Sequence, residues 1–162
     1  MKIRKVESTD LESFNALLNE VCSEKKYLAS IEGPSIESHK LFLDEIIEYK
    51  YIQMVAESDN QIIGWCDILP NSVKEYSHVG RVGMGVQREF RGRGLGRSLL
   101  EKCIEESKTR NFEKIELEVY SDNAGAVKLY ESVGFIKEGL KIRSRKYDGN
   151  KYQDIVLMGM VL

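Results

Sequence analysis

Apolar residues in the first third of the chain recur at the spacing of two helices. Over 11–22 they recur every three or four positions, which predicts the first helix, with Thr9 or Asp10 as its N-cap. The same spacing over 36–47 predicts a second helix, which Ser35 can cap. A short alternating segment before the first helix is typical of a strand.

Longer apolar runs in the middle of the chain predict three strands of a sheet. Residues 51–58 and 62–69 are joined by the polar residues "DNQ", which is a hairpin signal. Residues 79–86, "VGRVGMGV", predict a third strand. Its glycines at 83 and 85 fit a strand that another backbone approaches closely, or a bulge in the sheet.

The following segments alternate between helix and strand. Apolar residues over 95–104 form one helical stripe, and residues 114–120, "KIELEVY", alternate strictly, as a strand with one polar side does. A short helix follows within 121–135 and ends at Gly134, which is placed like the residue after a helix C-cap.

The end of the chain, residues 139–162, predicts a second hairpin about "DGN" at 148–150. We find neither a linker nor an internal repeat. Residues 1–162 are therefore predicted to form one α/β domain with a mixed sheet.

Composition narrows the class of protein. The chain is 42% hydrophobic and 31% charged with two prolines, which excludes global disorder. A net charge of −2 gives no general attraction to nucleic acid or an anionic membrane. Cys22, Cys66 and Cys103 lack disulfide or metal-ligand spacing, and no apolar run approaches the roughly 18 residues of a membrane span. We expect a cytoplasmic protein that binds no metal, nucleic acid or membrane.

One basic, glycine-rich stretch stands out, "REFRGRGLGR" at 88–97, with four arginines and three glycines immediately before a helical stripe. Glycines let backbone N–H groups converge on an anion, and a helix N-terminus favours negative charge. The alternative is a flexible loop with a solvated basic helix start. A Walker loop is excluded because Gly96 is followed by arginine instead of lysine, and the glycine spacing fails the dinucleotide fingerprint.

The order Arg91, two residues, Gly94, one residue, Gly96 resembles the signature loop of the GCN5-related N-acetyltransferases (GNAT family). The preceding "VGMGV" and the later "VYSDNAGAVKLYESVGF" are also similar to that family. The resemblance implies an α/β (α+β) fold: a mixed, mostly antiparallel twisted sheet of about six to seven strands, flanked by helices on both faces. It also implies acetyl-CoA as acetyl donor, and homodimers are common in the family.

By the same resemblance, the cofactor lies along the third predicted strand and the basic loop. The Val86 N–H is the implied donor to the thioester carbonyl. Tyr130 is the implied general acid toward sulfur, although its spacing alone is more typical of a packing residue on a short amphipathic helix. Asn123 either contacts the cofactor arm or caps the helix that follows. The implied cofactor-binding residues are Met84, Gly85, Val86, Arg91, Gly92, Arg93, Gly94, Leu95, Gly96, Arg97, Ser98, Asn123 and Tyr130.

The acceptor side is less determined by the sequence. An ammonium group must lose a proton before it attacks a thioester, and spacing does not choose among the candidate bases Glu32, Asp67, His78, Glu116 and Glu118. Tyr152 and Asp154 are further candidates to contact the acceptor, together with Glu32 and Asp67. Cys66 has no histidine placed by the sequence to activate it, so a covalent acyl-enzyme is not favoured.

The stretches "HVGRVGMGV", "GWCDI" and "DGNKYQD" resemble a bacterial subgroup of the family that is often linked to free amino acids or other small amines. We therefore predict an N-acetyltransferase that moves an acetyl group from acetyl-CoA to a small-molecule amine or amino acid, by direct attack in a ternary complex. Two alternatives stay open. One is an acetyltransferase acting on a protein N-terminus or lysine, and the other is an acyl-CoA-binding sensor without turnover.

Overall fold

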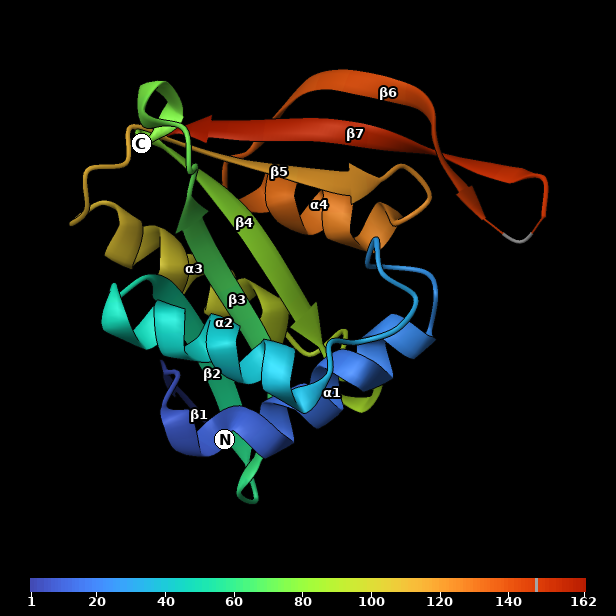
Figure 1. Ribbon diagram of the computed structural model, residues 1–162. Helices are drawn as coiled ribbons and strands as arrows, with labels where there is room; N and C mark the ends of the chain where they lie inside the picture. Colours follow the sequence, from blue (N-terminus) through green and yellow to red (C-terminus); the bar gives the residue numbers. More distant parts are fainter. Residues whose placement is uncertain (148) are drawn as a thin grey trace.

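A seven-stranded sheet in the order β1-β2-β3-β4-β5-β7-β6 organises the chain (Figure 1). The computed structural model describes residues 1–147 and 149–162. The strands are β1 (Lys2–Lys5), β2 (Ile52–Ser58), β3 (Gln61–Pro70), β4 (Val79–Val86), β5 (Lys114–Tyr120), β6 (Ile136–Tyr147) and β7 (Lys151–Val161). In the described residues only β4 and β5 pair in parallel, so the predicted mostly antiparallel sheet is confirmed.

Helices cover both faces of the sheet, as predicted (Figure 1). They are α1 (Leu11–Ser23), α2 (Ile36–Glu48), α3 (Leu95–Ser107) and α4 (Ala124–Val133), with 3₁₀ turns η1 (Ser8–Asp10), η2 (Lys74–Tyr76) and η3 (Arg88–Phe90). α1 and α2 bury Phe14 and Leu43 against Trp65 on one face. α3 and α4 bury Leu99 and Tyr130 on the other. No helix in the described residues is long and apolar enough to cross a membrane.

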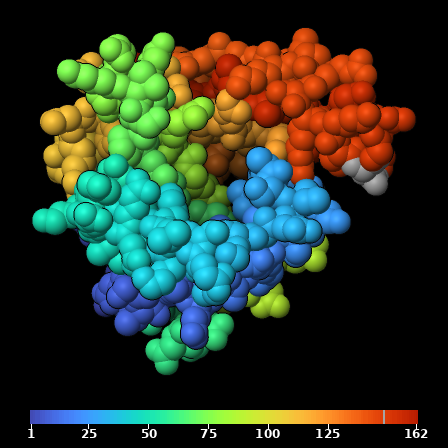
Figure 2. All heavy atoms as spheres, in the orientation of Figure 1, coloured from blue at the N-terminus to red at the C-terminus, as the bar shows by residue number. Residues whose placement is uncertain are grey.

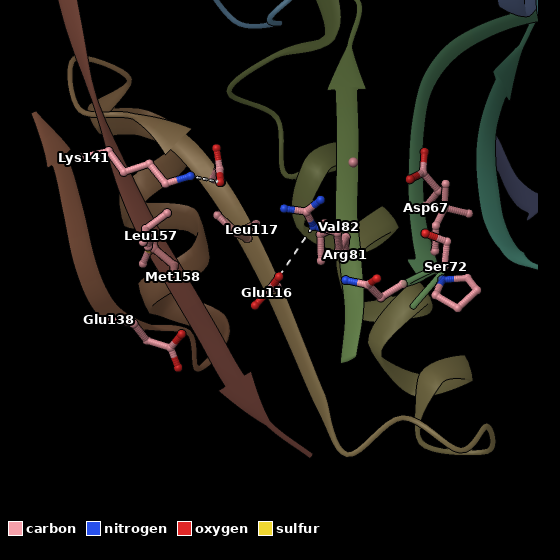
Figure 3. Close-up of a pocket in the computed structure, with 15 residues that line it drawn as sticks. Asp67, Ser72, Arg81, Val82, Glu116, Leu117, Glu138, Lys141, Leu157 and Met158 are labelled. Atoms are coloured by element: carbon pink, nitrogen blue, oxygen red, sulfur yellow. Dashed lines mark hydrogen bonds and ion pairs between the residues drawn. The ribbon is translucent and has the colours of Figure 1, made fainter. Parts of the chain in front are cut away.

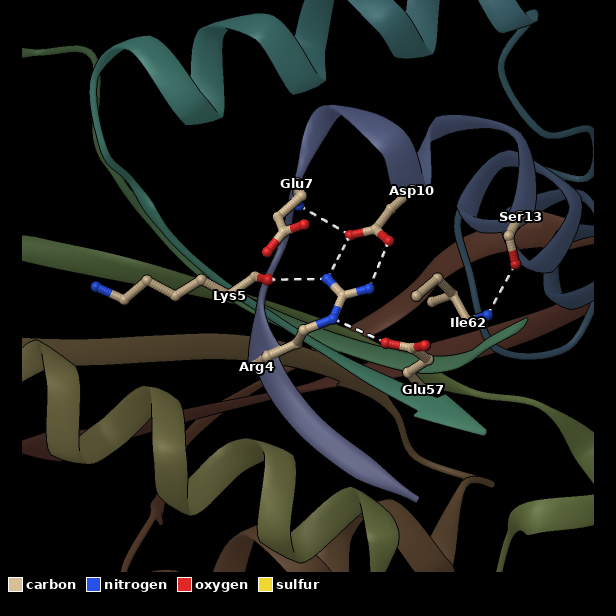
Figure 4. A network of polar contacts seen from close by, with 7 residues as sticks. All are labelled: Arg4, Lys5, Glu7, Asp10, Ser13, Glu57 and Ile62. Carbon is tan, nitrogen blue, oxygen red and sulfur yellow. Dashed lines mark hydrogen bonds and ion pairs between the residues drawn. The ribbon is translucent and has the colours of Figure 1, made fainter. Parts of the chain in front are cut away.

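The caps of the first two helices differ. Ser35 Oγ accepts the Ser38 N–H at 3.2 Å, as predicted. Asp10 occupies the N-cap position of α1, but its carboxylate makes no capping bond there. It instead accepts both Arg4 Nη1 and Arg4 Nη2 at 2.7 Å, while Arg4 Nε donates to Glu57 at 2.8 Å (Figure 4). The prediction of Asp10 as the N-cap residue is therefore confirmed, while its side chain takes part in this ion-pair network, which joins β1 to the start of α1.

The strands β4 and β5 pair only at their beginnings. Their register runs from Val79 with Lys114 to Arg81 with Glu116, and beyond these residues the strands diverge (Figure 1). On its other side β4 pairs with β3 without a register shift, so the alternative of a bulge at Gly83 or Gly85 was wrong. The sheet therefore opens into a wedge-shaped gap between β4 and β5.

The C-terminal hairpin is confirmed, with earlier bounds. β6 begins at Ile136 because Gly134, at φ 111°, ends α4 and turns the chain back at once. Two register shifts interrupt its pairing with β7. The predicted turn "DGN" includes residue 148, which lies outside the described residues.

Candidate active site

The loop between β4 and α3 is built from backbone. Gly92 and Gly94 have φ of 72° and 84°, in the left-handed region that favours glycine. Gly94 is the N-cap of α3, with no side-chain cap and no acidic residue in the first turn. A Cβ at either glycine would meet no atom within 4 Å. The first N–H groups of α3 therefore face open space and suit an anion.

The four arginines of this loop have different surroundings. The Arg91 guanidinium forms a bidentate pair with Glu24, just after α1, and its Nε donates to the Val86 carbonyl at 2.7 Å. Arg97 donates to Ser132 at 2.5 Å and to Glu101 at 3.1 Å. In the described part of the chain, the side chains of Arg88 and Arg93 make no hydrogen bond or ion pair. They are the arginines that can turn to a phosphate without breaking a contact.

The backbone of β4 presents donors to the gap. The Gln87 N–H donates to the Ile63 carbonyl at 2.8 Å. Because N–H groups alternate in direction along a strand, the N–H groups of the odd-numbered residues of β4 point to β3. The N–H groups of Met84 and Val86 therefore point away from β3, where β5 has already diverged. An extended ligand placed there can pair with them as an added strand would.

Tyr130 of α4 lies beneath this part of β4. It is 7% exposed and packs edge-on against Phe135 at 5.8 Å between ring centroids. Burial raises the pKa of Tyr130 above its usual value, with a smaller contribution from nearby Cys66, which is paired with Met84 across the sheet. Among the described residues no hydrogen bond is made to its hydroxyl. The phenol is thus protonated and available as a donor.

A cavity of about 680 Å³ opens on the face of the sheet beside α1 and α2. Figure 2 shows it as a hollow between the helical part and the C-terminal hairpin. Its lining comes from β3, β4, β5, β6 and β7 and from residues 71–72 (Figure 3). Its charged lining residues are Asp67, Arg81, Glu116, Glu118, Glu138 and Lys141.

Most charges in the cavity are paired. Arg81 Nε lies 3.5 Å from Glu116 Oε1, and Lys141 Nζ lies 2.5 Å from Glu118 Oε1 (Figure 3). Asp67 is different, because in the described part of the chain no cation lies within 4 Å of it. Burial raises the pKa of Asp67 to about 7, although hydrogen bonds from Gln53 and the Gly83 N–H oppose the shift.

The sequence of this chain matches the family model described as "Acetyltransferase (GNAT) family" over residues 15–135. The chain belongs to the GNAT family. It is 32% identical over 110 residues to the L-amino acid N-acetyltransferase AaaT of Escherichia coli, which covers 67% of each chain.

This GNAT chain also matches a second named enzyme and a solved structure. It is 38% identical over 77 residues to the [Ribosomal protein bS18]-alanine N-acetyltransferase of Salmonella typhimurium, about half of each chain (48% and 51%). Its fold matches the structure of yncA, a putative acetyltransferase of Salmonella typhimurium with its cofactor acetyl-CoA, with a TM-score of 0.93 at 18% identity, covering 99% and 93% of the two chains.

Within this GNAT chain, two of the predicted acceptor-side residues line the cavity, Asp67 and Glu118, as does the candidate base Glu116. His78 does not. Its carbonyl accepts the Glu113 N–H at 2.9 Å, at the end where β4 and β5 are paired. Glu32 is exposed on the α1–α2 connection and does not line the cavity.

The last two predicted acceptor residues lie on the hairpin instead. Tyr152 stacks on Arg143, with 4.0 Å from the guanidinium carbon to the ring centroid. Asp154 Oδ1 accepts the Arg143 N–H at 2.7 Å. Both contacts stabilise the hairpin where its register shifts, and neither residue lines the cavity.

Asn123 and Cys66 also receive a local explanation. Asn123 Oδ1 accepts the Ala126 N–H at 3.3 Å, so the capping role is confirmed, and its contact with a cofactor stays a prediction. Cys66 is fully buried, and its interaction with Cys103 raises the pKa of its thiol well above the usual value. In the residues that the structure describes, no cluster of His, Cys, Asp or Glu could hold a metal.

Sequence reasoning missed Gln53, Arg81, Lys141 and Glu24. Arg81 had a signal: it shares its strand face with Gly83 and Gly85, which have no side chains, so it is the residue next to that open stretch of β4 that can meet a ligand there. The other three had none, because strand order brings them to the site from β2, β6 and the end of α1.

Proposed function

We propose that this protein transfers an acetyl group from acetyl-CoA to the primary amine of a small molecule or amino acid, by direct attack in a ternary complex. The observation that carries the proposal is the placement of two groups about one stretch of β4. Asp67 pairs with Gly83 and Cys66 with Met84, and Tyr130 lies near Cys66 on the opposite face from Asp67. A proton donor and a proton acceptor thus flank the same backbone.

The chain's residues fit acetyl-CoA as donor. The uncapped start of α3, Gly92 and Gly94 suit a pyrophosphate, and Arg93 can add a charge-assisted bond. The N–H groups of Met84 and Val86 suit an extended amide-bearing arm in the gap. When bound, acetyl-CoA supplies a thioester carbonyl and a thiolate leaving group.

Two groups of the chain act on that thioester. The Val86 N–H donates to the carbonyl oxygen as negative charge develops there, a kind of contact that contributes about 10²–10³ in rate. Tyr130 gives its proton to the departing sulfur. A phenol is protonated at neutral pH, and burial raises the pKa of Tyr130 further, so the proton is present when the thiolate forms.

The cavity suits an acceptor that carries both charges. Asp67, Glu116, Glu118 and Glu138 favour an ammonium group. The exposed Arg81, whose contact to Glu116 is long at 3.5 Å, can also meet a carboxylate. This supports an amino acid, and the similarity to an enzyme named for L-amino acids agrees with it.

The test is release of free thiol from acetyl-CoA with a panel of amines, L-amino acids and short peptides. We expect turnover with amino acids, and Tyr130→Phe to lose about 100-fold or more in kcat with acetyl-CoA affinity unchanged. Tyr49→Phe is the matched control, because Tyr49 is exposed on the end of α2 and stacks on Tyr51.

The other outcomes of the thiol-release test would favour the alternative functions. Release only with peptides would favour a protein acetyltransferase, and acetyl-CoA binding without release would favour a sensor. Full activity of Tyr130→Phe would show that another group protonates the sulfur.

A further inference from the structure

A buried carboxyl and a buried amide lie together at the edge of the cavity. Asp67 on β3 and Gln53 on β2 face each other across antiparallel strands, and Gln53 Nε2 donates to Asp67 Oδ2 at 3.4 Å. The two residues are 7% and 2% exposed. Only Asp67 lines the cavity, so the carboxyl is the member of the pair that an acceptor can reach, and the amide lies behind it.

The Gln53 amide uses only its NH₂ group in this contact. Gln53 Oε1 is buried and has no hydrogen-bond partner in the part of the chain that the structure describes. A carboxylate only accepts hydrogen bonds, so it takes the amide NH₂, whereas a protonated carboxyl also donates and needs an acceptor. If the amide reverses about its last torsion, Oε1 takes the place of Nε2. Gln53 can therefore satisfy Asp67 in both protonation states.

We propose that Asp67 and Gln53 form a proton-accepting pair, in which Asp67 takes the proton of the acceptor ammonium and Gln53, a positioning residue, holds the carboxylate through Nε2 and the acid through Oε1. This inference rests on the proposed function, and it selects one base among the candidates that the cavity brings together.

The other carboxylates of the cavity are already held by cations. Glu116 faces Arg81, Glu118 pairs with Lys141, and Glu138 pairs with Lys114 at 2.7 Å. An ammonium group that enters the cavity finds Asp67 without such a partner. A buried, unpaired carboxylate gains the most from a cation beside it, since its charge is least screened.

The proton balance of the reaction needs one base and one acid. The ammonium carries three protons and the amide product keeps one. Asp67 takes the first as an N–H bond breaks and an O–H bond forms, which leaves the nitrogen lone pair to form the C–N bond. The C–S bond breaks with its electron pair on sulfur, and that sulfur takes up a proton from Tyr130, which the second amine proton replaces. The proton on Asp67 returns to water before the next turnover.

The pH dependence follows from the environment of Asp67. Its pKa of about 7 is set by burial, so the ionised, accepting form gains population as pH rises through neutrality. The charged groups that share the cavity with it are Arg81 of β4, Glu116 and Glu118 of β5, and Glu138 and Lys141 of β6. From β2 it faces the neutral Gln53, and none of the described residues of α1 or α2 pairs with it.

Asp67→Asn is the direct test. The amide has the shape of the protonated acid, and a reversed Gln53 can accept from it, so the variant should fold. We expect kcat/KM with the best acceptor to fall at least 100-fold while acetyl-CoA affinity stays within threefold. Asp44→Asn is the control, since Asp44 is an exposed aspartate paired with Lys40 on α2.

Gln53→Met separates positioning from packing. Loss of the Nε2 donor removes an interaction that lowers the pKa of Asp67. The increase of kcat/KM with pH should therefore move to higher pH by about half a unit or more, and at high pH kcat/KM should still reach the wild-type plateau. A merely structural Gln53 would change the plateau and leave the profile in place.

The outcomes separate the two proposals. Wild-type protein that releases no thiol with any acceptor would overturn the proposed function and this pair with it. An active wild type whose Asp67→Asn variant keeps its kcat/KM and pH profile would overturn the pair alone, as would an unshifted profile in Gln53→Met.

Discussion

Glycines serve the two sides of β4 in opposite ways. On the donor side, Gly92 and Gly94 lie at positive φ, and an added Cβ would meet nothing within 4 Å. On the acceptor side, a Cβ at Gly83 would lie 2.8 Å from Asp67 Oδ1, and one at Gly85 would lie 2.3 Å from the Trp65 ring. The first pair leaves space empty for a ligand, and the second pair gives its space to side chains of β3.

This difference shows how each half of the site is made. The donor half is backbone: two left-handed glycines and an uncapped helix start, all within one stretch of chain. The acceptor half is side chains, brought from β2, β3, β4, β5 and β6 by strand order. A change of conformation should therefore damage the donor half, and a change of charge or volume should damage the acceptor half.

The largest effect that we expect concerns the buried charge of the acceptor half. Asp67 has a pKa of about 7 in the folded protein against an ordinary value of 3.8, so between these pH values the folded state holds a proton that the unfolded chain has released. Its contribution to stability is full below about pH 4 and is lost as pH rises to about 7. Urea unfolding at pH 4 and pH 8 should show wild type losing about 4 kcal/mol relative to Asp67→Asn. If the free energy of unfolding changed equally for both proteins between pH 4 and pH 8, the carboxyl would be well solvated.

The next effect concerns volume on the same side. Gly85→Ala places a methyl group 2.3 Å from the Trp65 ring, which is closer than van der Waals contact allows. That ring packs against Phe14 in the core under α1 and α2, with 5.6 Å between ring centroids. We expect the free energy of unfolding to fall by about 1–3 kcal/mol, measured by urea denaturation. Gly125→Ala, on α4 with no atom within 4 Å of an added Cβ, should be neutral or slightly stabilising. A Gly85→Ala protein as stable as wild type would show that Trp65 can move aside.

These contrasts explain what the sequence could predict. The loop at 88–97 was recognisable because its glycines, arginines and helix are neighbours in the chain. The sheet and its helices followed from alternation and helical spacing, whereas the cavity depends on β5 and β7 lying between β4 and β6. Glycines at 83 and 85 were interpreted as a close approach or a bulge, because nothing local shows that Asp67 and Trp65 of another strand occupy their face.

A conformational change should affect the donor half with little effect on packing. Gly94→Ala puts a Cβ on a residue at φ 84°, which costs about 1–2 kcal/mol in the left-handed region. We expect acetyl-CoA affinity, measured by titration calorimetry, to fall about tenfold as the start of α3 reorients. The acceptor KM should not change at saturating acetyl-CoA. A change confined to the acceptor KM would place the loop in the other half of the site.

The smallest effect concerns the contact that joins the halves. Arg91 of the donor loop pairs with Glu24 at the end of α1 and also donates to the Val86 carbonyl, so its guanidinium holds the loop against the acceptor side. Glu24→Gln weakens that pair, which is partly exposed, so the effect should stay below about 1 kcal/mol. We expect acetyl-CoA to bind up to about fivefold more weakly by calorimetry, because Arg91 then orients the loop less firmly. Glu48→Gln, at the end of α2, is the matched control. Tighter binding in Glu24→Gln would mean the reverse: that Glu24 competes with the pyrophosphate for Arg91, and that the guanidinium itself belongs to the donor site.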